Sequence, residues 1–347
     1  MKKLKIGIIG AGRIGKVHTE TIVQSIPEAE VVSIVDLNLL EAENLAKKFN
    51  ISSYSQYYKD IMNNPEIDAV VICSPTDTHA QYIVEAAQAG KQIFCEKPIA
   101  LDLDTIQNAL DVVEECKVKL MIGFNRRFDS NFKKIKQMVV EGKIGDPHIL
   151  KITSRDPAPP PAEYVSVSGG MFLDMTIHDF DMARFIVGSE IEEVFVVAGV
   201  MVDPKIGEAG DVDTALITLR FENGAMGVID NSRKAVYGYD QRVEIFGSKG
   251  MIKVDNNYPD NHNYYGQDGI HASLPLNFFM DRYMEAYANE IKEFSQAILN
   301  DKQITVGGKD GLQAVRIGLA AKKSVKEKRP VKLSEILQGN DLLISQQ

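Results

Sequence analysis

The sequence predicts an α/β protein with two domains: an N-terminal doubly wound parallel sheet, and a C-terminal α+β domain with a large antiparallel sheet. Three observations predict this fold. The chain has 347 residues, about the length of two typical domains. Apolar runs alternate with helical periodicity in its first third. Beyond residue 123, strand-like runs follow one another with short turns between them.

The first third predicts a parallel sheet. Strands are expected at residues 4–9, 30–35, 68–73, 92–95 and 119–122, and helices at residues 13–24, 39–49, 80–89 and 103–116. Strands that are apolar at nearly every position, separated by helices of about ten or more residues, indicate a parallel sheet covered on both faces. We therefore predict a doubly wound domain over residues 1–123.

The remaining chain predicts a different architecture. Strands are expected at residues 148–154, 194–202, 214–222, 225–230 and 242–246, and helices at residues 131–141, 281–299 and 311–326. Asn223-Gly224 is typical of a β-hairpin, and residues 247–250 form a second tight turn. Hairpins join antiparallel strands, so residues 124–347 are predicted to form an α+β domain. Its C-terminal helix, about residues 309–326, is a candidate for packing back on the first domain.

One predicted strand suggests an oligomer. Residues 194–201 are apolar at almost every position. Such a strand either has both faces covered within one chain or buries one face against a second subunit. We favour the oligomer.

Composition excludes some classes of partner. The chain has 39 basic and 48 acidic residues, a formal charge of −9. An acidic surface repels phosphate backbones, which argues against nucleic-acid and anionic-membrane binding. Three cysteines without zinc-site spacing (Cys73, Cys95 and Cys116) indicate reduced thiols. No stretch is long enough to span a membrane, and the first apolar run is too short for a signal peptide, so we expect a cytoplasmic protein.

The motif Gly10-Ala11-Gly12-Arg13-Ile14-Gly15 follows a predicted strand and opens a predicted helix. This is the context of the Rossmann dinucleotide-binding turn. Gly10 allows the tight turn, Gly12 lets the backbone approach a diphosphate, and Gly15 lets the helix pack closely on the strand. The amides at the helix start then face the anion.

Asp36 closes the second predicted strand, 21 residues after Gly15. Its carboxylate can accept hydrogen bonds from a ribose diol and would repel a 2′-phosphate, which favours NAD over NADP. Arg13 could contact a phosphate, so NADP is not excluded. The alternative is a structural turn in which Asp36 caps the helix that follows.

In open α/β sheets, ligands bind beyond the carboxyl ends of the strands. This rule selects loop residues expected beside the nicotinamide half of the cofactor: Ser74, Pro75, Thr76, His79, Glu96, Lys97 and Pro98. For His79 the alternative is an ordinary polar residue in the first turn of a helix.

Asp174 and His178 are four residues apart, so on a helix they share a face. Histidine suits the removal of a hydroxyl proton because its unperturbed pKa lies near neutral pH. Asp174 would fix the imidazole tautomer, and Lys97 would stabilise a developing alkoxide. Taken singly, a structural hydrogen bond and a solvated turn lysine remain alternatives. A metal site at Asp174, His178 and Asp181 is not required for hydride transfer, and none is expected.

Three segments together resemble the glucose–fructose oxidoreductase / inositol dehydrogenase (Gfo/Idh/MocA) family. They are GIIGAGRIG at residues 7–15, CEKPIA at 95–100 and GGMFLDMTIHDFD at 169–181. The resemblance covers essentially the whole chain. The stretches GFNRRFD at 123–129, SRDPAPPP at 154–161, AVYGYDQR at 235–242 and NFFMDRYMEAY at 277–287 are most similar to the inositol 2-dehydrogenases of that family.

The resemblance implies that Lys97, Asp174 and His178 are catalytic, with His178 as the base. It also implies a substrate bound between the domains and a homotetramer built through the sheets. Residues expected by resemblance to line a polyol site are Arg127, Asp156, Tyr237 and Tyr283, with Asn125 near the cofactor. For Arg127 the alternative is a surface cation beside Asp129.

The expected activity is NAD-dependent oxidation of myo-inositol to the 2-inosose. The same chemistry on scyllo-inositol, D-chiro-inositol or an aldose such as glucose is the nearest alternative. A non-catalytic dinucleotide-binding regulator is a further alternative. The intact set of Lys97, Asp174 and His178 argues against it, because a regulator does not need those residues.

Overall fold

The computed structural model describes residues 3–336. The chain divides into two compact units. The first unit combines Met1–Phe128 with Met284–Val315, and the second combines Asp129–Tyr283 with Arg316–Gln347. This division differs from the predicted boundary at residue 123, because a segment near the C-terminus belongs to the first unit. The end of the second predicted domain, residues 337–347, lies outside the described residues.

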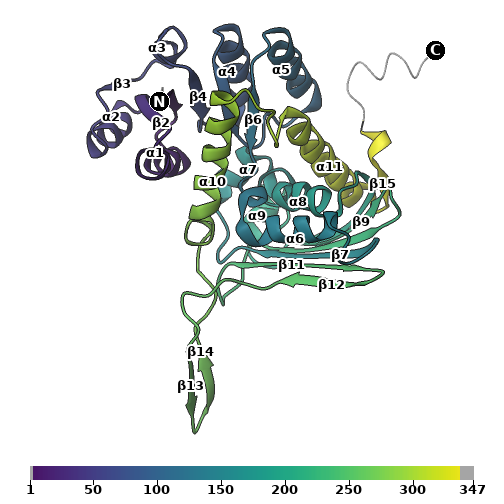
Figure 1. The fold of residues 1–347 in the computed structure, drawn as a ribbon. Coiled ribbons are helices and arrows are strands. Elements are labelled where there is room, and N and C mark those ends of the chain that lie inside the picture. Colours follow the sequence, from purple (N-terminus) through teal and green to yellow (C-terminus); the bar gives the residue numbers. More distant parts are fainter. Residues whose placement is uncertain (1–2, 337–347) are drawn as a thin grey trace, which may run out of the picture. The chain divides into compact units, whose positions relative to one another are not determined.

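The first unit contains a six-stranded parallel sheet, which confirms the predicted doubly wound fold (Figure 1). Its strands, in the spatial order β3-β2-β1-β4-β5-β6, are β3 (Ser53–Ser55), β2 (Ala29–Val35), β1 (Leu4–Ile9), β4 (Ala69–Ile72), β5 (Gln92–Glu96) and β6 (Leu120–Gly123). The order reverses between β1 and β4, which is where such sheets bind their ligands. The side chains of β4 are buried at every position, as expected for a strand covered on both faces.

Five helices connect these strands, and a short 3-10 turn follows β6. They are α1 (Arg13–Ser25), α2 (Leu39–Lys48), α3 (Lys59–Met62), α4 (Thr76–Gln88), α5 (Leu103–Glu115) and η1 (Asn125–Phe128). The sequence predicted the four long helices and missed β3 and α3, which are three and four residues long. Elements this short carry too little periodicity to be recognised.

Two long helices carry the chain between the units: α10 (Phe279–Leu299) and α11 (Gly308–Glu327). In the first unit, Phe294 of α10 is fully buried and packs edge-on against Phe94 of β5, with ring centroids 5.8 Å apart. The Ile122 N–H donates to the Val306 carbonyl at 2.9 Å. Residues 284–315 therefore complete the first unit's core, and this contact is why the boundary moves.

The second unit contains a seven-stranded sheet in the order β12-β11-β7-β10-β9-β8-β15. Its strands are β7 (Pro147–Arg155), β8 (Ile191–Gly199), β9 (Thr214–Phe221), β10 (Met226–Ser232), β11 (Asp240–Gly247), β12 (Gly250–Val254) and β15 (Val331–Lys332). The sheet is mixed, because β7 and β10 are parallel neighbours. The other neighbouring strands pair antiparallel, which confirms the predicted, largely antiparallel sheet. β7 and β10 are the parallel exception because β8 and β9 lie between them in sequence and pack to one side. The hairpin at Asn223-Gly224 is confirmed, with Gly224 at a φ of +87°.

Helices cover one face of this sheet (Figure 1). They are α6 (Ser130–Val140), α7 (Ala162–Ser168), α8 (Ile177–Val187) and α9 (Pro204–Glu208), with the π-helical turn η2 (Met171–Met175) leading into α8. Asp129 caps α6 by accepting hydrogen bonds from the N–H groups of Asn131 and Phe132. It also binds Arg282, so the start of α6 is fixed by a buried ion pair.

The opposite face of the sheet carries several exposed apolar side chains. Strand β8 alternates: Val194 and Val196 are buried, whereas Val197 is 61% exposed. Direct cross-strand pairing places Val197 beside Leu216, and Phe246 beside Met251. The residues that we call the outer sheet face are Val197, Leu216, Met226, Phe246 and Met251, all of them exposed. One face of the strand is therefore covered within the chain and the other is not.

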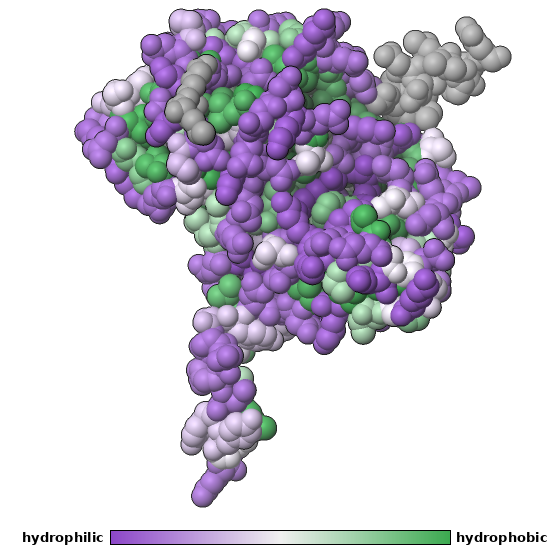
Figure 2. All heavy atoms as spheres, viewed as in Figure 1, coloured by the Kyte–Doolittle hydropathy of each residue, from purple (hydrophilic) through white to green (hydrophobic). Residues whose placement is uncertain are grey.

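A two-stranded hairpin extends from the second unit, formed by β13 (Asn263–Gly266) and β14 (Gly269–Ala272) (Figures 1 and 2). Nearly all its side chains are exposed, including Tyr264, Tyr265 and Ile270. The sequence analysis did not predict this hairpin. Among the described residues, none of the helices is long and apolar enough to cross a membrane.

Candidate active site

The predicted glycine motif forms the turn between β1 and α1. Gly10 has a φ of +105°, a conformation that glycine adopts without strain. A Cβ atom on Gly15 would lie only 1.9 Å from the Gly10 carbonyl oxygen, and one on Gly10 would lie 2.6 Å from the Cys73 carbonyl oxygen. The first turn of α1 thus passes directly over the loop, and only glycine permits that approach.

The start of α1 has room for an anion. Gly12 is the N-cap residue, no side chain caps the helix there, and a Cβ atom on Gly12 would meet nothing within 4 Å. The free N–H groups and the helix dipole at such a terminus attract negative charge. Gly12, Arg13 and Ile14 therefore fit the diphosphate of a dinucleotide.

Asp36 lies just beyond β2 and holds the glycine loop. Its Oδ2 accepts a hydrogen bond from the Ala11 N–H at 2.7 Å, and its Oδ1 accepts one from the Asn38 N–H at 2.8 Å. Each oxygen keeps a second lone pair for a ribose hydroxyl. Asn38 caps α2 by accepting from the Leu40 N–H, so the helix-capping alternative for Asp36 is wrong.

His79 ties together two of the predicted cofactor loops. It is buried in α4, with Nδ1 2.7 Å from the Pro98 carbonyl oxygen and Nε2 2.8 Å from the Ser74 carbonyl oxygen. Burial lowers the pKa of this imidazole, which favours the neutral ring. The contacts of His79, and of Ser74, Pro75 and Thr76, with the cofactor stay predictions.

The end of β5 carries the predicted catalytic lysine. Glu96 is the last residue of the strand, and its Oε1 lies 2.6 Å from Nε2 of the buried His18 in α1. Lys97 follows at once and is half-buried, and Pro98 is fully packed. The two neighbours of Lys97 in the chain are therefore both held in place: Glu96 by His18, and Pro98 by His79.

Asn125 and Arg127 lie in η1, and both are buried. Arg127 Nη2 donates to Asp310 Oδ1 at 2.8 Å, within the first unit. Asp129 pairs instead with Arg282, so the surface-cation alternative for Arg127 is wrong. The roles of Asn125 at the cofactor and of Arg127 at a polyol stay predictions.

Asp174 and His178 lie in the second unit on a segment that is otherwise buried. Between residues 171 and 184, these two are the residues that are partly exposed. The segment is not one regular α-helix. Asp174 lies in the π-helical turn η2, closed by a hydrogen bond from the Thr176 N–H to the Met171 carbonyl at 2.8 Å, and His178 lies in α8. A π turn is wider than an α turn and is frequent at functional sites.

Arg233 is a site residue that the sequence analysis missed. It is buried, and its guanidinium lies 3.5 Å from the carboxylates of both Asp156 and Asp174. Tyr164 donates to Asp174 Oδ1 at 3.1 Å. The structure therefore gathers Asp156 and Asp174 around one cation. The sequence signal that could have found Arg233 is its position directly after the end of β10, two residues before the segment 235–242 that carries the family resemblance.

Buried hydrogen bonds anchor the Asp174–His178 segment on the sheet. Thr176 Oγ1 donates to Asn231 Oδ1 at 2.7 Å, and Asn231 Nδ2 donates to Asp179 Oδ2 at 3.0 Å. Asp181, considered as a metal ligand together with Asp174 and His178, is buried with an oxygen 3.9 Å from Arg184. Since breaking a buried network is costly, the register of this segment is firmly fixed.

The two predicted polyol tyrosines differ in setting. Tyr237 is half-buried, donates to Asp240 Oδ2 at 2.6 Å and accepts from Arg155 Nη1 at 2.9 Å. Burial and the Asp240 carboxylate raise the pKa of Tyr237, so its hydroxyl stays protonated. Tyr283 is 1% exposed, with its hydroxyl 3.5 Å from Gln241 Oε1. Substrate contacts by both tyrosines stay predictions.

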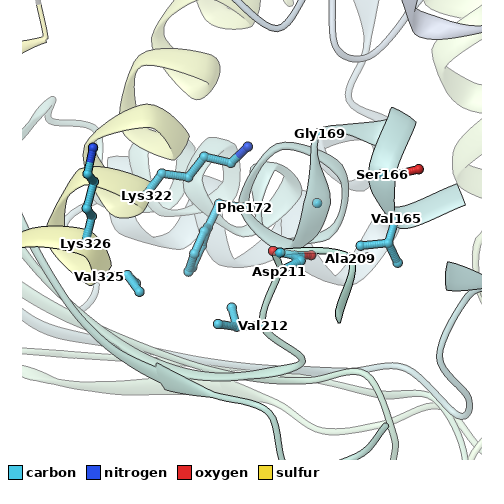
Figure 3. Close-up of a pocket in the computed structure, with 12 residues that line it drawn as sticks. Val165, Ser166, Gly169, Phe172, Ala209, Asp211, Val212, Lys322, Val325 and Lys326 are labelled. Carbon is cyan, nitrogen blue, oxygen red and sulfur yellow. The ribbon is translucent and has the colours of Figure 1, made fainter. Parts of the chain in front are cut away.

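A separate pocket of about 370 Å³ lies in the second unit (Figure 3). Its lining comes from α7, η2, the loop after α9, and α11, and includes Phe172, Asp211 and Lys322. Asp211 Oδ2 accepts from the Met171 N–H at 2.7 Å, and burial raises the pKa of this carboxyl. Asp174 and His178 do not line the pocket, so we do not assign the predicted catalysis to it.

Comparisons with known proteins agree on one family. Residues 4–124 match the model of the oxidoreductase family with an NAD-binding Rossmann fold, and residues 132–253 match the GFO/IDH/MocA C-terminal domain. A myo-inositol 2-dehydrogenase of Thermotoga maritima is 48% identical, covering 96% of this chain and 100% of the relative. An inositol 2-dehydrogenase of Rhizobium meliloti is 45% identical, with coverages of 95% and 99%.

A solved structure extends the comparison to the fold. The scyllo-inositol dehydrogenase from Lactobacillus casei, with bound NAD(H) and scyllo-inositol, matches with a TM-score of 0.90 at 32% identity, covering 96% of this chain and 100% of that one. The chain therefore belongs to the Gfo/Idh/MocA oxidoreductase family, and its cofactor is NAD. The open helix start at Gly12 and the carboxylate of Asp36 fit that cofactor.

Replacing Asp36 by alanine should weaken NAD binding by about 10- to 100-fold, since a hydrogen bond to a charged group contributes about 1.5–3 kcal/mol. NADP binding should hold or improve, because the carboxylate that repels a 2′-phosphate is gone. Calorimetric titration with both dinucleotides measures this. Glu30→Gln, at the other end of β2, is the control. Equal losses for NAD and NADP would mean that Asp36 only holds the loop through Ala11.

Proposed function

We propose that this chain oxidises one hydroxyl of a cyclic polyol, converting myo-inositol to the 2-inosose with NAD. The observation that carries the proposal is the exposure of Asp174 and His178 on a segment whose other residues, from 171 to 184, are buried. A substrate can therefore reach the carboxylate of Asp174 and the imidazole of His178, whereas the rest of the segment packs in the core. The inositol dehydrogenases among its relatives support a cyclic polyol as the substrate.

In this proposal, His178 takes the proton of the reacting hydroxyl. NAD, when bound, supplies the acceptor for the hydride that leaves the same carbon. Asp174, which contacts Arg233 and Tyr164, orients the imidazole and stabilises its protonated form. Lys97 provides the cation that stabilises the developing alkoxide. These roles for Lys97, Asp174 and His178 are the catalytic part of the proposal.

Polyol recognition needs both donors and acceptors, since every hydroxyl is both. Asp156, held beside Arg233, is an acceptor, and Tyr237 lies between a carboxylate and a guanidinium. We propose Asp156, Tyr237, Arg127 and Tyr283 as polyol residues beside the catalytic three. The proposed cofactor residues are Gly10, Gly12, Arg13, Ile14, Gly15, Asp36, Ser74, Pro75, Thr76, His79, Glu96, Lys97 and Asn125.

A panel assay of NADH formation tests the substrate. It compares myo-, scyllo- and D-chiro-inositol and glucose, each with NAD and with NADP. We expect the highest kcat/KM for myo-inositol with NAD. A preference for scyllo-inositol, the ligand of the Lactobacillus casei structure, would keep the chemistry and change the substrate. NAD binding without oxidation of any polyol in the panel would contradict the proposal and favour a regulator.

Replacing His178 by alanine should lower turnover by roughly two to four orders of magnitude, because the general base is lost. The dissociation constant of NAD should stay near that of the unmodified chain, since the dinucleotide motif lies in the first unit. Steady-state kinetics and a binding titration measure both quantities. His148→Ala, at an exposed position of β7, is the matched control. Normal turnover of His178→Ala would remove His178 from the base role.

We also propose that the protein acts in the cytoplasm. All three cysteines are free thiols. Burial raises the pKa of Cys73 and Cys95, which keeps them protonated and unreactive. Thiols left unpaired in this way suit a reducing compartment.

The assembly that we propose is a homotetramer built through the outer sheet face. Exposed apolar patches of this kind on a soluble protein mark interaction sites. The charged residues Lys151 and Glu244 on neighbouring strands pair with each other at 3.0 Å, so they add little net charge to this side of the sheet. A two-stranded hairpin such as β13–β14 is marginally stable in water alone, so a partner copy is expected to support it.

Leu216→Glu should break this assembly, because it places a charge beside Val197 on the outer sheet face. Light scattering coupled to size-exclusion chromatography should show a tetramer for the unmodified chain and smaller species for the variant. Val140→Glu, at an exposed position of α6 on the other side of the sheet, should leave the mass unchanged. A monomeric unmodified chain would contradict the proposal.

A further inference from the structure

A buried ionisable cluster lies in the first unit, apart from the catalytic residues proposed above. It consists of His18 in α1, Glu96 at the end of β5 and Glu290 in α10, and one ligand-type atom of each lies within 4.8 Å of the others. His18 and Glu290 have no exposed surface, and the Glu96 side chain is 12% exposed. We call these three residues the His18 cluster.

Glu290 is the unusual member of the cluster. Both carboxylate oxygens are buried and have no hydrogen-bond partner among the described residues. An ionised carboxylate in that setting is strongly disfavoured, because neither water nor a hydrogen-bond donor compensates its charge. Burial and the neighbouring charge of Glu96 raise the pKa of Glu290 well above its ordinary value. Both causes favour the protonated carboxyl, since burial disfavours any charge on Glu290 and Glu96 disfavours a second negative charge beside its own.

Contacts with His18 and with Gly123 hold the Glu96 carboxylate in place. His18 Nε2 lies 2.6 Å from its Oε1. Gly123 pairs with it across the sheet, and a Cβ atom on Gly123 would lie 3.0 Å from Oε2, so the carboxylate lies closely over that glycine. The His18 ring is itself packed edge-on against Phe94 and Tyr287. Glu96 is therefore the ordered acceptor at the centre of the cluster.

We propose that Glu290 is protonated, which avoids a second buried negative charge beside Glu96, and that the His18 cluster in this form fixes the strand end from which Lys97 leaves. Glu290 is then a positioning residue for the dehydrogenase reaction. The positioning role depends on the proposed function of Lys97, whereas the protonation of Glu290 does not. His79 holds the Pro98 carbonyl on the other side, so Lys97 is framed by buried contacts.

A divalent cation is the competing occupant, since a histidine and two carboxylates are ordinary ligands. The geometry favours the proton. Two ligands about 2.1 Å from one metal ion, at 90° or more to each other, lie about 3 Å or more apart. His18 Nε2 and Glu96 Oε1 are 2.6 Å apart, which is a hydrogen-bond distance and too short for two ligands of one ion.

Infrared difference spectroscopy tests the protonation directly. At neutral pH, the spectrum of the unmodified chain minus that of Glu290→Gln should contain the C=O stretch of a protonated carboxylic acid. Glu293→Gln, one turn away on α10 and outside the cluster, is the matched control and should give no such band. Absence of the band for Glu290, or one equivalent of divalent metal in the purified protein by elemental analysis, would overturn the proposal.

The pH dependence of stability gives a second test, with a sign that follows from linkage. The folded state holds a proton on Glu290 that the unfolded chain releases above about pH 4.3. Stability is therefore lost as the pH rises from there through the folded-state pKa. Glu290→Gln removes that loss, so its melting temperature should gain on that of the unmodified chain toward alkaline pH. The other ionisable groups that face Glu290 (His18, Cys73 and Glu96) are present in both proteins and cancel in the difference.

Kinetics test the positioning role. With the best polyol of the panel, Glu290→Ala should lower kcat by about 10-fold, because misplacing a catalytic group slows the chemical step. The dissociation constant of NAD should change much less than kcat, since most of the proposed cofactor residues lie in other loops. Glu290→Gln, which is neutral and nearly the same shape as a protonated glutamate, should keep kcat within about two-fold of that of the unmodified chain. Ser295→Ala, also buried on α10, controls for loss of packing. Equal kcat in Glu290→Ala and the unmodified chain would overturn the positioning role. Because the infrared band needs no turnover, failure of the proposed function would leave the protonation test intact.

Discussion

The close approach of α1 to the loop after β1 is the constraint on which the first unit depends. No side chain fits at Gly10 or Gly15, since an added Cβ atom would lie 2.6 Å or less from a backbone oxygen. The same approach aims the uncapped start of α1 outward at Gly12 and brings the Ala11 N–H onto Asp36. One packing requirement therefore creates both the open helix start that fits a diphosphate and the position of the Asp36 carboxylate, which is proposed to bind the cofactor.

Local sequence patterns were sufficient to predict the helices and strands that bury a continuous apolar face. The strands β1, β2, β4 and β5 and the glycine turn were predictable because each is defined within a few residues. The parallel pairing of β7 with β10 was not, since strands distant in sequence meet there and no short-range signal encodes it. The place of residues 284–315 in the first unit was unpredictable for the same reason, since the contact between Phe294 and Phe94 joins residues that are far apart in the sequence.

In the candidate site, too, some residues could be predicted from the local sequence and others could not. Asp174 and His178 were visible as a polar pair inside an apolar run, and their shared exposure is what such a pair implies. Their supports were not visible. Arg233 is 59 residues from Asp174, and Glu290 and His18 join Glu96 from two other elements. A side chain that acts by contacting another across the fold has no pattern of its own in the sequence. The π turn at Asp174 was not predictable either, since its hydrogen bond spans only one residue more than that of an α turn.

The proposed catalytic residues are held by polar contacts in both units. In the second unit, Asp174 is held by Arg233 and Tyr164, and the hydrogen bonds of Thr176 and Asp179 with Asn231 anchor its segment on the sheet. In the first unit, Lys97 follows a carboxylate that is paired with His18 and close to Glu290. The Asp174 and Glu96 side chains are 15% and 12% exposed, so solvent screens neither set of contacts freely. A buried network resists movement, because every unsatisfied group in it is costly. The strand end that carries Lys97 and the segment that carries the proposed base are therefore both held firmly in place.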